Sequence, residues 1–271
     1  MIILNKKWWL LFVGFFLYLP LQSQEQKTEY VTVTTLHRNT SNPDLKREDW
    51  LKIEKEYFDK VVMKNPLILG YNLLTHFYTA NSSEVIIVNH YGSWEAIDKS
   101  WDKSQELIKQ AWPDEKARKD FFEKRSSFYE NSHSDEIYVV LPNSKSLVKI
   151  PDKQMIYYVR KTEFANNKNG SAKEFDAMNK EFVENVFHKN ELIKAYYSYQ
   201  HAWGSRGAEF VEVSVYDNLS DLEKAGDRDE DLIKQHWPNE VKLKEFDEKL
   251  GGYFIRSHGD YIYRNEIGFQ K

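Results

Sequence analysis

The sequence repeats itself at a fixed spacing of 125 residues, and this repeat constrains the fold more than any other feature. The segment 107–113 (LIKQAWP) returns as 232–238 (LIKQHWP). The same ungapped offset pairs identical residues elsewhere, among them Tyr71 with Tyr196, His76 with His201, Glu84 with Glu209 and Tyr138 with Tyr263. One register held from residue 67 to residue 138 indicates a tandem duplication. Two copies are too few for a solenoid, so we expect each half to pack face to face with the other.

The N-terminus has the succession that is typical of a secretory signal peptide: Lys6 and Lys7, an apolar run over 8–21, and a polar end at 22–25. A bilayer takes about 20 apolar residues, which is more than this run offers. We predict a signal peptide over 1–24, a first repeat over 25–142, a linker over 143–152 and a second repeat over 153–271. The protein should then be exported, periplasmic or secreted; an uncleaved N-terminal anchor is the alternative.

The composition excludes several classes of function. The chain has 42 acidic residues, 38 basic residues and no cysteine, and its formal net charge is -4. Nucleic-acid binding needs clustered Lys and Arg, so no nucleic-acid partner is expected. The missing cysteine excludes disulfides, thiolate catalysis and cysteine zinc sites. No segment after the signal peptide approaches membrane length, so we expect no membrane association after cleavage.

The sequence of each half predicts the same order of elements, β-α-β-β-α-β. Strands are expected over 30–37, 67–78, 84–91 and 136–141, and again over 155–162, 192–203, 209–216 and 261–266. Apolar residues spaced by three and four predict that Trp50, Ile53 and Tyr57 lie on the buried face of the first helix. Trp112 and Trp237, each followed by proline, should fill the core at junctions between helices.

A β-α-β-β-α-β unit is the ferredoxin-like arrangement. With two such units, residues 28–266 resemble the dimeric α/β-barrel superfamily, in which two ferredoxin-like units bring their sheets together around a central cavity. The resemblance implies an α+β fold of two tandem ferredoxin-like repeats that pair within the chain as a pseudo-two-fold α/β barrel. Its members include small monooxygenases, haem-handling enzymes and stress-responsive proteins, so the resemblance does not set the activity.

Alternation along the third strand of each half predicts which side chains face the cavity. The apolar face with Ile86, Val88, Val211 and Val213 is shared by the halves, so we expect it to meet the helices. The opposite, mixed face should line the cavity. With the repeat-paired histidines added, the predicted ligand-binding residues are Asn89, Tyr91, His76, His201, Glu212, Ser214 and Tyr216. The alternative is that these polar groups bond one another and water.

A second repeated pattern places a histidine two residues before an aspartate, as His133 with Asp135 and His258 with Asp260. On an extended segment both side chains point the same way, which suits metal binding or proton transfer. If strands of the two halves meet, His76 should approach His258, and His201 should approach His133. The alternative is structural, with each aspartate accepting backbone N–H groups at the start of the fourth strand. We predict this structural role and assign no metal.

The leading functional prediction is an exported protein that binds a small, partly apolar or aromatic ligand between the two sheets. No nucleophile elbow, P-loop or dinucleotide-binding motif is present in the sequence. The resemblance allows a cofactor-independent monooxygenase or a haem-binding enzyme, and a purely structural assembly block is the third alternative. Haem would need an axial ligand, for which His76, His201, His133 and His258 are the candidates. Otherwise no cofactor is expected, and whether the protein is an enzyme stays open.

Overall fold

The computed structural model describes residues 27–166 and 170–271, so the predicted signal peptide lies outside the described residues. The strands are β1 (Tyr30–His37), β2 (Gly70–Tyr78), β3 (Glu84–Tyr91), β4 (Ser134–Val140), β5 (Ile156–Phe164), β6 (Ala195–Trp203), β7 (Glu209–Tyr216) and β8 (Phe254–Gln270). The helices are α1 (Arg47–Tyr57), α2 (Trp94–Ala111), α3 (Glu115–Ser127), α4 (Ala172–Phe182), α5 (Leu219–His236) and α6 (Glu240–Gly251), and the π-helical turns η1 (Phe58–Val62) and η2 (Val183–Phe187) follow α1 and α4. None of the helices in these two ranges has both the length and the apolar character that crossing a membrane requires.

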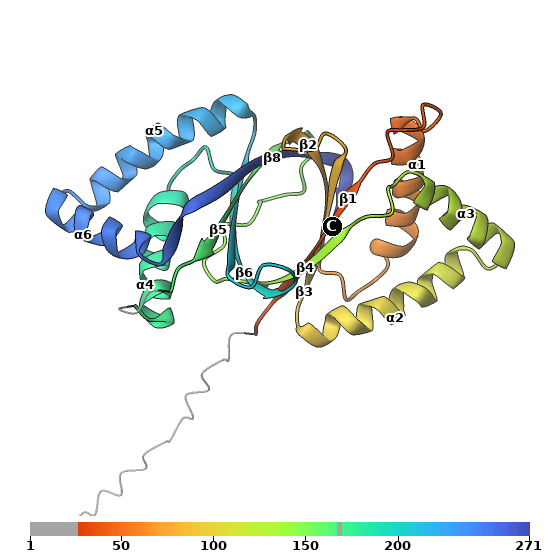
Figure 1. The fold of residues 1–271 in the computed structure, drawn as a ribbon, viewed down its shortest axis with the longest axis horizontal. Helices are drawn as coiled ribbons and strands as arrows, with labels where there is room; N and C mark the ends of the chain where they lie inside the picture. The colour runs from red at the N-terminus through yellow and green to blue at the C-terminus, as the bar shows by residue number, and fades with distance from the viewer. Residues whose placement is uncertain (1–26, 167–169) are drawn as a thin grey trace, which may run out of the picture.

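All strands join one closed antiparallel barrel in the order β1-β3-β2-β8-β5-β7-β6-β4, and β4 returns to β1. The order β4-β1-β3-β2 of the first half is repeated by the second half as β8-β5-β7-β6. The halves are joined where β2 pairs with β8 and where β4 pairs with β6. Figure 1 shows the barrel at the centre of the molecule, with all helices outside it.

The fold class that we predicted from the sequence is therefore wrong. We expected two tandem ferredoxin-like repeats whose sheets pack face to face as an α/β barrel, whereas the strands form one eight-stranded antiparallel sheet that closes on itself. The reason lies in the edge strands. Two separate sheets would leave unpaired backbone N–H and C=O groups along β2, β4, β6 and β8. Pairing across the halves satisfies these groups and abolishes the edges.

The helices cover the outer surface of the barrel in two groups, α1 to α3 on one side and α4 to α6 on the other (Figure 1). Trp50 of α1 is completely buried, and its indole N–H donates to the Tyr129 hydroxyl at 2.8 Å. It belongs to a core cluster with Tyr71 and Val85 of the barrel, which confirms the predicted buried face of this helix. Trp112 is also buried, with its ring centroid 4.1 Å from that of Phe121, as predicted for a helix junction.

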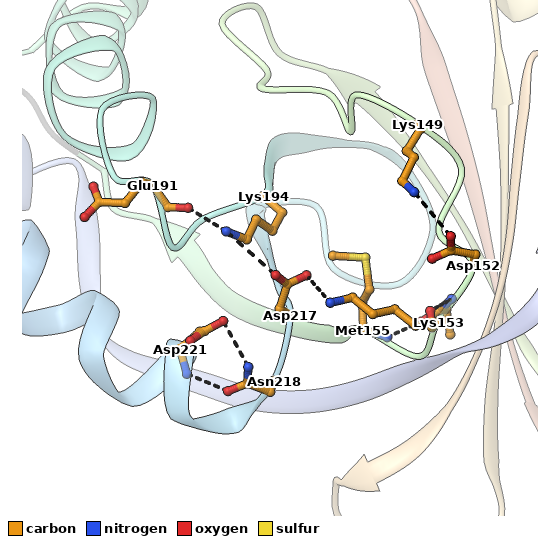
Figure 2. Close-up of polar contacts among 10 residues, drawn as sticks. Lys149, Asp152, Lys153, Met155, Glu191, Lys194, Asp217, Asn218 and Asp221 are labelled. Carbon is orange, nitrogen blue, oxygen red and sulfur yellow. Dashed lines mark hydrogen bonds and ion pairs between the residues drawn. The ribbon is translucent and has the colours of Figure 1, made fainter.

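The segment between the halves is held by ion pairs, which Figure 2 shows in close-up. Asp217, at the end of β7, lies between two lysines, with Lys153 Nζ at 3.0 Å and Lys194 Nζ at 3.8 Å. Lys149 pairs with Asp152 at 3.2 Å within the segment itself. Lys153 thus ties the chain to β7 just after the predicted linker, and the linker itself contacts the second half where the backbones of Lys145 and Tyr196 exchange two hydrogen bonds of 2.8 Å.

Candidate functional site

The interior of the barrel holds a cavity of about 360 Å³, within the range of small-molecule sites. Side chains from all eight strands line it, because successive residues of a strand point alternately into and out of a barrel. The predicted cavity therefore exists, but it lies inside one closed barrel instead of between two sheets.

The third strand of each half has the reverse of the orientation that we predicted. Ile86 and Val88 of β3 line the cavity, as do Val211 and Val213 of β7. The opposite face, where we placed ligand-binding residues, meets the helix layer. The error has a physical cause: the inside of the barrel is mostly aliphatic here, so an apolar face does not by itself mark contact with helices.

The five ligand-binding residues predicted on these strands lie on that outer face. Tyr91 belongs to the cluster around Trp50, and Tyr216 to a cluster under α5. Glu212 accepts a hydrogen bond of 2.6 Å from the Tyr196 hydroxyl, and burial raises the pKa of this carboxyl. The other two of the five residues, Asn89 and Ser214, lie on the same outer face of β3 and β7. A ligand in the barrel would not reach these five side chains.

The cavity wall differs between the two halves. At equivalent positions of the sheet, Val31, Asn72 and Leu74 of the first half are replaced by Tyr157, Tyr197 and Tyr199 of the second. The wall from the first half is thus mostly aliphatic, with the Asn72 amide in it, and the wall from the second half carries the tyrosines; Glu84 and Lys161 add one charge of each sign. Burial raises the pKa of all three phenols above the usual value for tyrosine, so each stays protonated at neutral pH. The wall from the second half thus offers neutral hydroxyl groups to the cavity.

Two tyrosine–glutamate pairs connect the halves at one end of the cavity. The Tyr138 hydroxyl of β4 donates to Glu209 of β7 at 2.5 Å, and the Tyr263 hydroxyl of β8 donates to Glu84 of β3 at 3.1 Å. Burial and the adjacent carboxylate raise the pKa of each tyrosine. Glu84 is the first residue of β3, and Glu209 is the first residue of β7. These two strands run in the same direction along the barrel, so both pairs lie at the same end.

Our sequence reasoning did not single out these four residues as functional. The signal was available, because both members of each pair are identical at the offset of 125 residues. An identical residue in two diverged copies marks a shared constraint, and here the shared constraint is a hydrogen bond between the halves.

The two repeat-paired histidines lie beside these pairs. His201 is opposite Tyr138 in the β4–β6 ladder, and His76 is opposite Tyr263 in the β2–β8 ladder. They differ in their contacts: His76 Nδ1 is 2.8 Å from the Thr79 hydroxyl, whereas buried His201 Nε2 has no hydrogen-bond partner among the described residues. A Glu136 carboxylate oxygen lies 3.8 Å from His201 Nε2.

The expected approach of these histidines to the opposite His–Asp pairs is wrong. His76 faces Tyr263, which is five residues beyond His258. His201 faces Tyr138, which is five residues beyond His133. Both pairs are instead surface features. His133 Nε2 is 3.1 Å from Asp135, and His258 Nε2 is 3.2 Å from Asp260, with both members partly exposed.

The aspartates do not cap the backbone as we predicted. Asp135 accepts from the Thr34 hydroxyl and Asp260 from the Tyr158 hydroxyl, each at 2.6 Å across the neighbouring strand. The strand ladder already uses the local N–H groups, so the carboxylates pair with side chains instead. Within residues 27–166 and 170–271, no three His, Asp or Glu side chains are grouped as a metal site.

Comparison with known proteins relates this chain to others through its fold. No family model matches the sequence, and no curated protein matches it either. A solved structure of a proposed monooxygenase from Fusobacterium nucleatum is similar, with a TM-score of 0.56 at 13% identity, over 91% of this chain and 95% of that one. A proposed monooxygenase from Lactobacillus acidophilus gives 0.52 at 13% identity, over 88% and 93%.

A chlorite dismutase variant from Candidatus Nitrospira defluvii also has this fold, with a TM-score of 0.51 at 11% identity, over 88% of this chain and 91% of that one. Together these neighbours show that the chain shares its fold with solved structures to which it is only 11–13% identical. That the chain is a fusion of two tandem units stays a prediction.

Proposed function

We propose that the protein is exported and binds a small, partly apolar or aromatic molecule inside its barrel. The observation that carries the proposal is the cavity of about 360 Å³, with a mostly aliphatic wall and a wall of neutral tyrosines. Apolar walls with a few placed polar groups are the usual composition of small-molecule sites.

Naphthalene is a suitable probe because it is planar, apolar and smaller than the cavity. Equilibrium dialysis should show that the mature protein binds it. Val213→Trp places an indole in the cavity and should abolish binding, whereas Val148→Trp, at a fully exposed linker position, should bind like the wild type. Far-UV circular dichroism confirms that both variants fold. Equal binding by the two variants would place the probe outside the barrel and contradict the proposal.

A second candidate is oxidation of the bound ligand by dioxygen without a cofactor. The shared fold with proposed monooxygenases is compatible with it, and one feature of the cavity favours it. Tyr138 lines the cavity and donates to buried Glu209, so this pair can take a proton from a bound phenol. In such a reaction 1-naphthol and dioxygen would give 1,4-naphthoquinone and water.

An oxygen electrode tests this candidate with 1-naphthol as substrate. Glu209→Gln should abolish oxygen uptake, because an amide does not accept the proton. Glu163→Gln is the matched control, since this carboxylate pairs with Arg206 at the partly exposed surface. No uptake by the wild type leaves ligand binding as the function.

Haem was the third alternative, and the four histidines predicted to bind it do not fit. Haem iron needs an axial ligand with a free lone pair. Among the residues that line the cavity, His90 is the single histidine, and because its Nε2 is 2.9 Å from a Glu29 carboxylate oxygen, Nδ1 is the ring nitrogen that could bind iron. The four histidines predicted as axial ligands do not line the cavity. We therefore do not propose haem on the predicted ligands, and a Soret band in the spectrum of the purified protein would contradict this.

A further inference from the structure

The cavity contains one tyrosine hydroxyl without a partner. Tyr199 of β6 lines the cavity, and burial and the neighbouring phenols of Tyr197 and Tyr157 raise the pKa of its hydroxyl, with no hydrogen bond to it from any residue that the structure describes. The side chain is well positioned nonetheless: its ring is nearly parallel to that of Tyr197, at 11° and 6.4 Å between centroids, and lies 6.5 Å from that of Tyr138. A fixed, unpaired donor that faces an apolar space is the kind of group that orients a ligand.

The other tyrosine hydroxyls of the cavity are already engaged. Tyr138 and Tyr263 donate to glutamates, and Tyr157 is 3.5 Å from the Asn72 side-chain oxygen. Against the larger effect of burial, Ser146 and the backbone N–H of Leu147 lower the pKa of Tyr197, so its oxygen serves as an acceptor for these groups. Among these five hydroxyls, that of Tyr199 is therefore the one without a protein partner among the described residues.

We propose that Tyr199 anchors the ligand by donating a hydrogen bond to a neutral carbonyl oxygen carried on an aromatic body. This inference rests on the proposed function and adds the chemical class of the ligand. Burial keeps the Tyr199 phenol protonated, so that it acts as a donor. Charges of both signs line the cavity, with Glu84 and Lys161 among them, so net charge does not select the ligand. A carbonyl accepts the hydrogen bond from Tyr199 without adding charge. The rings of Tyr197 and Tyr199 offer flat faces to a planar molecule.

The test compares naphthalene with 1-acetonaphthone, which carries the same rings and one ketone oxygen. Equilibrium dialysis of the mature protein should show tighter binding of the ketone. Tyr199→Phe should weaken ketone binding by about 3- to 10-fold, the size of one net hydrogen bond, and leave naphthalene binding unchanged. Tyr197→Phe is the matched control: it makes the same change two residues away on the same strand, where the hydroxyl already has protein partners, and it should retain the preference for the ketone.

The outcomes separate this inference from the proposed function. If Tyr199→Phe keeps the ketone preference, or if Tyr197→Phe loses it to the same extent, the anchoring role of Tyr199 is overturned. Equal affinity of the wild type for both probes overturns the carbonyl class. If neither probe binds the wild type, or if Val213→Trp still binds naphthalene, the proposed function fails, and the inference fails with it.

Discussion

Replacing Tyr138 by phenylalanine removes the hydroxyl that donates to Glu209 in the interior of the barrel. Glu209 is only 4% exposed, and its carboxylate oxygen is 3.8 Å from Lys161 Nζ. A hydrogen bond to a charged group contributes about 1.5–3 kcal/mol, and a buried carboxylate oxygen without its donor loses that contribution in full. We expect Tyr138→Phe to lower the free energy of unfolding by about 2–3 kcal/mol. For a protein of this size the melting temperature should fall by about 4–10 °C.

The chain supplies its own control for this substitution. Tyr263→Phe makes the same change at the equivalent position, where Glu84 is partly exposed and lines the cavity. Water can replace the lost hydroxyl there, so the loss should be about 0.5–1.5 kcal/mol. Adding Glu209→Gln to Tyr138→Phe should recover part of the stability, since a neutral amide costs less to bury than a carboxylate.

Urea denaturation at pH 7, followed by far-UV circular dichroism, measures these free energies. The reasoning requires the loss in Tyr138→Phe to exceed that in Tyr263→Phe by at least about 1 kcal/mol. Equal losses would mean that burial of the carboxylate does not set the strength of the bond. A loss below about 0.5 kcal/mol for Tyr138→Phe would mean that Glu209 finds another donor, and would refute the argument.

Three further predictions concern pH, the backbone and export. Burial raises the pKa of Asp229 to about 6, so the folded protein binds this proton more tightly than the unfolded chain does, and stability falls as pH rises from about 4 to 6. Asp229→Asn should therefore raise the free energy of unfolding by about 1 kcal/mol at pH 7, after allowance for partial exposure, and should not change it near pH 3.5. An equal gain in stability at the two pH values would contradict this prediction. Gly204 has φ of +137°, and an added Cβ would lie 1.5 Å from a Glu136 carboxylate oxygen, so Gly204→Ala should cost about 1–3 kcal/mol in urea denaturation. Gly207→Ala, with no atom within 4 Å of the added Cβ, should cost less than about 1 kcal/mol, and similar losses would refute the strain argument. N-terminal sequencing of the exported protein should show that the first 23 or 24 residues have been removed; a mature chain that begins at Met1 in the membrane fraction would contradict export by a cleaved signal peptide.

The positions of many elements could be predicted from local sequence alone. The strand over 84–91 and the strand over 209–216 have the predicted bounds, and the buried stripe of the first helix is where its spacing placed it. These features depend on residues two to four positions apart, so a short window of sequence contains the information. The predicted fourth strand of the second half was too short. β8 covers Phe254–Gln270 because its first part pairs with β5 and its last part pairs with β2.

The direction in which a strand face points could not be predicted in the same way. Alternation shows that the two faces of β3 differ, but both are covered, one by the barrel interior and the other by the helices. When both faces are buried, polarity no longer tells inside from outside. The candidate residues on the outer face, such as Tyr91 and Tyr216, were therefore assigned to the wrong side.

By itself the sequence determined the repeat, the order of its elements and the identity of the residues that both copies share. Only the tertiary structure decided that the sheet closes through β2–β8 and β4–β6, because satisfying edge strands depends on partners far apart in the chain. Tyr138 and Glu209 are 71 positions apart, and Glu84 and Tyr263 are 179 apart. Their hydrogen bonds, and the free hydroxyl of Tyr199 beside them, exist because closure brings strands of both halves around one cavity.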